Sequence, residues 1–147
     1  MISLPSSMRR RAGTFSSVAK RCAYGECRHS LDWDLFIPPR DLANFDLLNP
    51  ILELETGESI SLLGPRGEGF VQTFQTTWGV VQFHLVVPGV RIFDEAAQRT
   101  EVKTLPSGVK VPCLSGTDLL AAKEAANRPS DQDDIAYLKE LFRLGRF

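Results

Sequence analysis

Hydrophobic and polar residues alternate with two different periods along this chain. Residues 32–37 form a short run of mostly apolar side chains that is closed by Pro38 and Pro39, a pattern typical of a buried strand ending in a turn. Residues 70–76 alternate between polar and apolar, and residues 80–87 are almost wholly apolar, so both segments are predicted as strands.

Weaker strand signals occur in three other places. Residues 59–63 are predicted as a short strand, and the Gly-rich residues 64–69 as a hairpin connection, since they lack the Lys-Ser/Thr ending of a phosphate-binding loop. Residues 101–105 and 109–111 are predicted as a strand pair, with Pro112 marking the end of the second strand.

Helical spacing is found first over residues 41–54, where five apolar residues recur on one side. Pro50 is expected to interrupt or kink this helix, because it removes a hydrogen bond and clashes with the preceding turn. Residues 16–24 and 93–99 are predicted as shorter helices. The apolar positions of the first helix are Leu42, Phe45, Leu48, Ile51 and Leu52.

Two helices are predicted at the C-terminal end. Residues 115–118 have the spacing of a capping box before an apolar run, and residues 130–133 repeat that spacing before a second one. The helices are joined through residues 127–129, and the second carries a single apolar stripe. That stripe consists of Ile135, Leu138, Leu141 and Phe142.

Length and composition favour one soluble domain. The 147 residues are 43% hydrophobic and 24% charged, with a net charge of −1, so the chain lacks the overall positive charge typical of a nucleic-acid-binding protein. Residues 1–13 are interpreted as a loose basic tail and residues 14–147 as a single domain. No apolar run is long enough to span a membrane, and no membrane partner is expected.

The cysteines add little chemistry. Cys22, Cys27 and Cys113 are odd in number and lack paired C-x-x-C spacing, which favours reduced thiols in the cytoplasm over disulfides or a zinc site.

Two acidic residues give the clearest chemical signal. Asp32 and Asp34 are two positions apart on a predicted strand, so their side chains project from the same face. Carboxylates held in this way suit hard cations such as Mg²⁺, which also bridges substrate phosphates. Solvated carboxylates at the start of a strand are the alternative interpretation.

Three blocks of sequence together resemble the nucleotidyltransferase superfamily. Residues 25–35 look like the family segment Gly-x-x-Arg-x-Thr-x-Asp-x-Asp-Leu, with Ser30 in place of Thr. Residues 79–90 are similar to the strand that delivers the family's third carboxylate. Residues 111–135 resemble its C-terminal pattern, a helix carrying Lys followed by Arg-x-x-Asp-x-x-Asp. The resemblance covers roughly residues 16–143. Within the superfamily, the chain resembles the small bacterial proteins akin to abortive-infection toxins of toxin–antitoxin systems.

The resemblance implies an α/β (α+β) fold, with a mixed β-sheet flanked by helices that pack mainly on one face and two C-terminal helices closing the site. It also implies Mg²⁺-dependent transfer of a nucleoside monophosphate from a nucleoside triphosphate to a hydroxyl of RNA or protein, with Mn²⁺ as the alternative ion. The expected partners are the triphosphate and either tRNA or another RNA, or a cognate antitoxin protein.

The same resemblance assigns individual roles. Asp32 and Asp34 are expected to be catalytic residues that bind the metal. Lys123 is expected to be a catalytic residue that contacts the phosphates as a point charge. The expected nucleotide-binding residues are Ser16, Ser17, Arg28, Ser30, Gln82, Arg128, Asp131 and Asp134.

Two departures from the family pattern leave a second hypothesis open. Gln82 stands at the position of the third carboxylate, or His84 does if the alignment slips by two, and neither supplies a negative charge. Ser16 and Ser17 replace the family's Gly-Gly or Gly-Ser, where backbone N–H groups would meet the triphosphate. The second hypothesis is a non-catalytic relative that binds a nucleotide, an RNA or a partner protein.

The residues at the C-terminal end also allow ordinary structural roles. Lys123 is equally well interpreted as an exposed lysine. Arg128, Asp131 and Asp134 are interpreted, with slight preference, as a charge network at the start of a helix, and His84 as a hydrogen-bonded histidine of the sheet.

Overall fold

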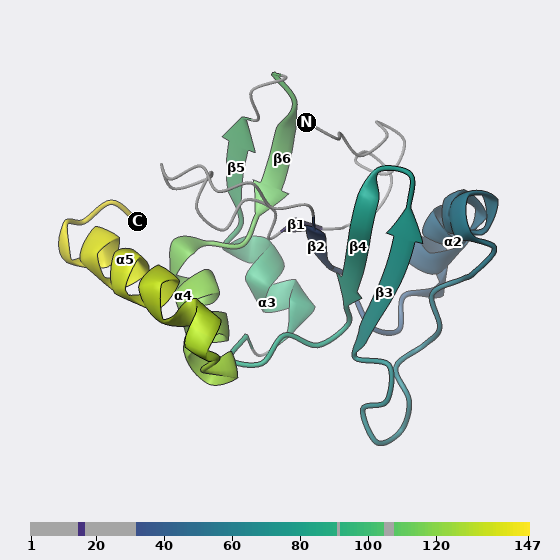
Figure 1. Cartoon of the computed structure of the whole chain (residues 1–147), viewed down its shortest axis with the longest axis horizontal. Helices are drawn as coiled ribbons and strands as arrows, with labels where there is room; N and C mark the ends of the chain where they lie inside the picture. The colour runs from purple at the N-terminus through teal and green to yellow at the C-terminus, as the bar shows by residue number, and fades with distance from the viewer. Residues whose placement is uncertain (1–14, 17–31, 91, 105–107) are drawn as a thin grey trace.

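The computed structural model describes residues 15–16, 32–90, 92–104 and 108–147 (Figure 1). This part of the chain is a mixed α/β structure with two small sheets and four α-helices. None of these helices combines the length and the apolar composition needed to cross a bilayer. The elements in chain order are β1 (Phe15–Ser16), β2 (Asp32–Phe36), α2 (Leu42–Thr56), β3 (Val71–Thr76), β4 (Gly79–His84), α3 (Phe93–Gln98), β5 (Glu101–Thr104), β6 (Lys110–Cys113), α4 (Gly116–Ala126), the 3-10 helix η2 (Pro129–Asp131) and α5 (Gln132–Arg143).

The larger sheet has the strand order β1-β2-β4-β3. Strand β2 runs parallel to β4 and antiparallel to β1, and β3 and β4 form an antiparallel hairpin, so the predicted mixed sheet is confirmed. Ser16 belongs to β1 and pairs with Leu35 of β2, so its assignment to a helix over residues 16–24 is wrong. The pairing covers the edge of β2 that β4 leaves open. The rest of that predicted helix, residues 17–24, lies outside the described residues, as does the predicted tail over residues 1–13.

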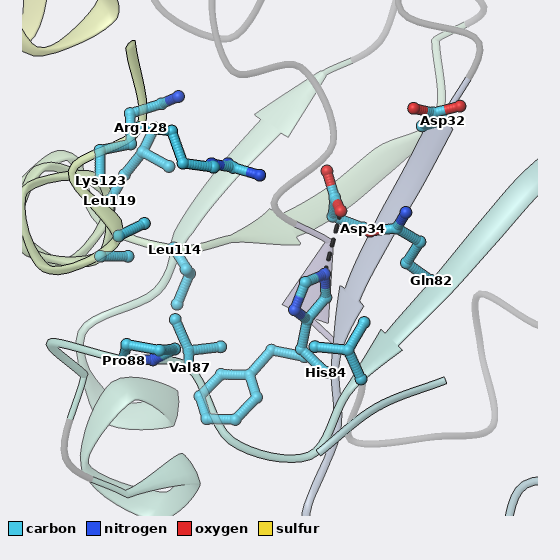
Figure 2. A pocket seen from close by; sticks show the side chains of 14 residues that line it. Asp32, Asp34, Gln82, His84, Val87, Pro88, Leu114, Leu119, Lys123 and Arg128 are labelled. Carbon is cyan, nitrogen blue, oxygen red and sulfur yellow. Dashed lines mark hydrogen bonds and ion pairs between the residues drawn. The ribbon is translucent and has the colours of Figure 1, made fainter. Parts of the chain in front are cut away.

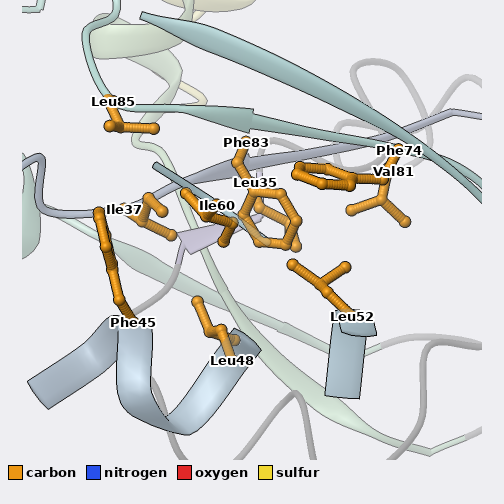
Figure 3. Packing of buried hydrophobic residues seen from close by; sticks show 10 residues of the cluster. All are labelled: Leu35, Ile37, Phe45, Leu48, Leu52, Ile60, Phe74, Val81, Phe83 and Leu85. Carbon is orange, nitrogen blue, oxygen red and sulfur yellow. The ribbon is translucent and has the colours of Figure 1, made fainter. Parts of the chain in front are cut away.

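Alternate residues of the central strands form the main core (Figure 3). Leu35 of β2 and Val81 and Phe83 of β4 point to one face of the sheet, where helix α2 covers them. Each buried side chain of this size contributes about 1.5–3 kcal/mol relative to an exposed one. The core consists of Leu35, Ile37, Phe45, Leu48, Leu52, Ile60, Phe74, Val81, Phe83 and Leu85.

Helix α2 continues through Pro50 to Thr56, so the predicted interruption is wrong. Its first turn is capped by Asp41, whose carboxylate accepts a hydrogen bond of 3.1 Å from the backbone N–H of Asn44. Loss of a helical hydrogen bond at proline costs about 3 kcal/mol. Leu48 and Leu52, at 1% and 0% exposure on either side of it, anchor the helix to the sheet and offset that cost.

The opposite face of the sheet carries a second, smaller core. Phe36 of β2 packs there with Val90, Ala96 of α3 and Leu114, and the Phe36 and Phe93 rings meet edge to face at 5.2 Å. Helices therefore lie on both faces of the sheet, and the expectation that they pack mainly on one face is wrong. The reason is strand alternation, because the even-numbered residues of β2 form a face of their own.

Residues 59–63 form no strand, contrary to prediction. Two side-chain amides supply the hydrogen bonds that a neighbouring strand would otherwise make. The amide of Asn49 pairs with both backbone groups of Ile60, and the amide of Gln72 pairs with those of Ser61. The turn at residues 64–69 is closed by its own backbone hydrogen bonds, and only its C-terminal side leads into a strand.

Strands β4 and β6 end at different residues than predicted. Strand β4 stops at His84 instead of residue 87. The backbone N–H of Leu85 still donates to the carbonyl of Phe70 at 2.7 Å in the hairpin register, and the chain then enters a turn in which the N–H of Val90 donates to the carbonyl of Val87 at 3.0 Å. Strand β6 runs past Pro112 to Cys113, and Pro112 pairs with Val102 of β5. Proline is tolerated there because each strand of a two-stranded sheet is an edge strand.

The two predicted C-terminal helices are confirmed. Ser115 caps α4, and its hydroxyl accepts from the backbone N–H of Asp118 at 3.1 Å. Helix α5 buries Ile135, Leu138 and Leu141, whereas Phe142 of the predicted stripe is 59% exposed.

The start of the second helix differs from that of α4. Asp131 precedes α5 but makes no side-chain cap hydrogen bond, because its carboxylate binds other side chains.

Candidate functional site

A pocket of about 310 Å³ lies between helix α4 and the face of the larger sheet that carries Asp32 and Asp34 (Figure 2). Six polar side chains that line it were singled out from the sequence, and they come from β2, β4, α4 and the turn after α4. Residues almost a hundred positions apart therefore meet at one place. The six are Asp32, Asp34, Gln82, His84, Lys123 and Arg128.

The first side of the pocket is the strand wall, defined here as Asp32, Asp34, Gln82 and His84. Parallel pairing of β2 and β4 sets Asp34 directly opposite Gln82, with Asp32 and His84 also lining the pocket. The expected position of Gln82 beside the carboxylates is thus confirmed. Asp34 is 7% exposed, whereas Asp32 lies at the exposed start of its strand.

His84 contacts one of these carboxylates. Its Nε2 lies 3.0 Å from Oδ1 of Asp34, and its side chain is 23% exposed (Figure 2). The interpretation of His84 as a hydrogen-bonded histidine of the sheet is confirmed. The contact joins residues 50 positions apart and depends on the β2–β4 register.

The second side is the helix wall, defined here as Lys123 and Arg128, which line the pocket, together with Asp131 and Asp134, which bind Lys123. Lys123 is only 4% exposed, so its interpretation as an exposed lysine is wrong. Its Nζ donates to Oδ1 of Asp131 at 2.8 Å and to Oδ2 of Asp134 at 2.7 Å. These carboxylates hold the ammonium group in place and stabilise it in a buried position.

Arg128 completes the helix wall from the turn between α4 and η2. Its Nε donates to Oδ2 of Asp131 at 2.7 Å, while the side chain stays 60% exposed and borders the pocket. Burial alone would raise the pKa of Asp131, but the hydrogen bonds from Lys123 and Arg128 outweigh it and lower that pKa. The predicted charge network at the start of the last helix is therefore confirmed, with Lys123 as an additional member.

Apolar side chains form the floor of the pocket, and none of them was predicted as part of the site. Leu119, Ala122 and Ala126 lie on the same side of α4 as Lys123, at positions three, four and seven residues apart. That helical spacing is a signal from which the sequence reveals them once Lys123 is assigned to the site. The loop after β4 adds Val87 and Pro88.

Helix α4 and this loop approach each other closely. Gly89 has a φ of +82°, and a Cβ at this position would overlap the backbone carbonyl of Ala121. A glycine is therefore needed for α4 to close the pocket at the end of β4.

The donor set fits one Mg²⁺ ion better than two. Asp32 and Asp34 offer carboxylate oxygens and Gln82 an amide oxygen, and Mg²⁺ is ordinarily bound by one or two carboxylates together with substrate phosphates and water. Among the residues that the structure describes, no three His, Cys, Asp or Glu side chains gather as a potential metal site. Gln82, directly opposite Asp34, lines the pocket without adding a negative charge.

The other predicted site residues are not placed at the pocket by the structure. Ser16 is part of β1, and Ser17, Arg28 and Ser30 lie outside the described residues. Cys22 and Cys27 do too. Cys113 is buried, and burial raises the pKa of its thiol to about 11, so it is protonated at neutral pH.

Comparison with known proteins adds no assignment. Neither the protein-family models nor the curated proteins include a match to this chain.

Proposed function

We propose that this pocket binds a nucleoside triphosphate together with one divalent cation, Mg²⁺ or Mn²⁺, and that the protein is a nucleotidyltransferase. The observation that carries the proposal is the meeting of Asp32, Asp34 and Gln82 with Lys123 and Arg128 around one pocket. These are the residues that the sequence pattern predicts for a triphosphate site.

The charges of the two walls support a ligand that brings a cation. On the helix wall, two basic groups are matched by two carboxylates, while the strand wall carries two carboxylates and an amide. A triphosphate alone would be repelled by Asp32 and Asp34. A divalent cation between the phosphates and these carboxylates removes that repulsion.

The helix wall suits the far end of the triphosphate. Arg128 is exposed on the pocket side and offers guanidinium donors, which match phosphate oxygens well. Lys123 is bonded to Asp131 and Asp134, which offset its charge, so its ammonium group keeps a fixed position that needs no reorganisation when the ligand binds.

In the proposed reaction a hydroxyl of RNA or protein attacks the α-phosphorus, and pyrophosphate leaves. A bound cation would neutralise charge on the phosphates. The residues of this chain orient the phosphates between the two walls, so that the attacking and leaving oxygens lie in line.

A second candidate, a non-catalytic protein that binds a nucleotide or an RNA, is favoured by one observation. Gln82 is neutral at the position where a third carboxylate would bind a second cation and activate the acceptor hydroxyl. A protein with this pocket would bind the triphosphate without transferring its nucleotide.

Calorimetric titration of ATP, GTP, CTP and UTP, each with Mg²⁺ or Mn²⁺, tests the proposal. We expect at least one triphosphate to bind only when the cation is present, and the Asp32→Asn/Asp34→Asn variant to lose that binding. The matched control is Asp46→Asn/Asp94→Asn, which removes the same charge at two exposed positions away from the pocket.

Two outcomes would contradict the proposal. One is a folded wild type that binds none of the four triphosphates. The other is a loss of binding that is equal in the pocket variant and the control, which would reflect net charge instead of the site. If binding is confirmed, incubation with a radiolabelled triphosphate and total RNA or protein distinguishes the enzyme from the non-catalytic candidate.

A further inference from the structure

His84 lies in the strand wall, and the proposed reaction assigns it no part. His84 follows Gln82 by two residues on β4. It pairs with Phe36 of β2, which follows Asp34 by two residues. Nε2 is 3.0 Å from Oδ1 of Asp34. Both side chains border the pocket, so the contact is part of the site (Figure 2).

The chemistry of the two groups determines the direction of this hydrogen bond. An ionised carboxylate has acceptor sites only, so Nε2 must carry the hydrogen and donate it to Asp34. The imidazole thereby restricts rotation of a carboxylate that is itself 7% exposed.

We propose that His84 is a positioning residue for the cation site. It holds the Asp34 carboxylate in the orientation that binds the ion. This inference rests on the proposed function. Its physical basis is that hydrogen-bond partners of metal-binding carboxylates fix their orientation, and their loss typically weakens metal affinity 10–100-fold. Such support matters more in this pocket than in a complete three-carboxylate site, because Gln82 brings no charge to compensate for a displaced Asp34.

Two substitutions distinguish the effect of the donated hydrogen bond from the effect of the ring's volume. In His84→Gln the side-chain amide nitrogen is as many bonds from the backbone as Nε2, so it reaches Asp34 and donates. In His84→Phe a ring of similar size remains but the donor is lost, and the half-buried position accepts an apolar ring. Thermal unfolding of both variants checks whether the fold is retained.

The measurement is titration with Mn²⁺ alone, following the signal of the free ion by electron paramagnetic resonance. We expect His84→Phe to bind Mn²⁺ 10–100-fold more weakly than wild type, and His84→Gln to stay close to wild type. If His84→Phe binds as tightly as wild type, the hydrogen bond does not position Asp34 and the inference is overturned. Equal weakening of both variants would also overturn it, because the imidazole itself would then be required, as a ligand or for packing.

Failure of the inference is distinguishable from failure of the proposed function. A wild type that binds Mn²⁺ with triphosphate, together with an unaffected His84→Phe, overturns the positioning role alone. A wild type that binds no cation at all contradicts both.

A second measurement needs no metal. The chain has two histidines, His29 and His84, so a His29→Gln protein labelled with ¹⁵N-histidine reports on His84 alone. We expect the hydrogen on Nε2, and a shift of the Nε2 signal when Asp34 is replaced by Asn. An Nε2 without hydrogen would overturn the proposed direction of the bond.

Discussion

The two walls of the pocket carry different sets of polar side chains. On the helix wall, Lys123 and Arg128 are paired with Asp131 at 2.7–2.8 Å, and Lys123 is also paired with Asp134. On the strand wall, two carboxylates lie on one face of β2, and the hydrogen bond to Asp34 comes from an imidazole.

This difference predicts that the helix wall contributes mainly to stability and the strand wall mainly to cation binding. Charges that neutralise each other inside the protein stabilise the arrangement of α4 and α5 and are sensitive to the loss of any member. Carboxylates gathered on one strand face are suited to an external cation instead. Substitutions on the helix wall should therefore change the free energy of unfolding, and substitutions on the strand wall should change cation binding.

The largest effect on stability is expected for Lys123→Met. Asp131 and Asp134 would then remain buried without their ammonium partner, and breaking a buried ion pair in this way costs about 3–5 kcal/mol. Urea denaturation measures the change. The matched control is Lys139→Met, which breaks an exposed ion pair with Glu124 and should cost less than about 1 kcal/mol. Equal costs for both variants would contradict the buried network.

A smaller effect, dependent on pH, is expected for Asp131→Asn. This variant should lose about 2 kcal/mol at pH 7, since a hydrogen bond to a charged group contributes about 1.5–3 kcal/mol. The pKa of Asp131 is lowered in the folded protein, so its charge stabilises the fold above the ordinary aspartate pKa. As the pH falls below about 4, towards the lowered pKa, this contribution disappears. The difference in unfolding free energy between wild type and variant should therefore shrink there. A difference that stays constant from pH 7 to pH 3 would contradict the assignment.

The smallest effect on stability is expected for Asp32→Asn on the strand wall. Asp32 is exposed, and exposed substitutions usually change the unfolding free energy by less than about 0.5 kcal/mol. The same urea denaturation checks this. A loss similar to that of Asp131→Asn would show that the strand wall is built for stability and would remove the contrast between the two walls.

The sequence predicted the parts of the site that depend on local periodicity. Period-two alternation placed Asp32 and Asp34 on one face of a strand, and capping at Ser115 gave the start of the helix that carries Lys123. The family resemblance then brought Gln82 to the same place, and the β2–β4 register agrees with it.

Interactions between distant residues could not be predicted in the same way. Burial of Lys123 depends on how α5 packs against α4, and the Asp34–His84 contact depends on parallel pairing across 50 residues. Residues 59–63 resembled a strand in composition, yet the side-chain amides of Asn49 and Gln72 bind the backbone of Ile60 and Ser61 in place of a neighbouring strand. Asp131 was predicted in a charge network with Arg128 and Asp134, but its bond to Lys123 of the preceding helix was not predicted.

The central claim, that the strand wall is a cation site lacking one charge, is tested most directly by Gln82→Asp. Calorimetric titration with Mg²⁺ should show affinity raised about tenfold or more, because about 1.4 kcal/mol of added attraction gives that factor. Gln98→Asp, which adds the same charge at an exposed position outside the pocket, should leave the affinity unchanged. A folded Gln82→Asp protein that binds Mg²⁺ no better than wild type would contradict the account.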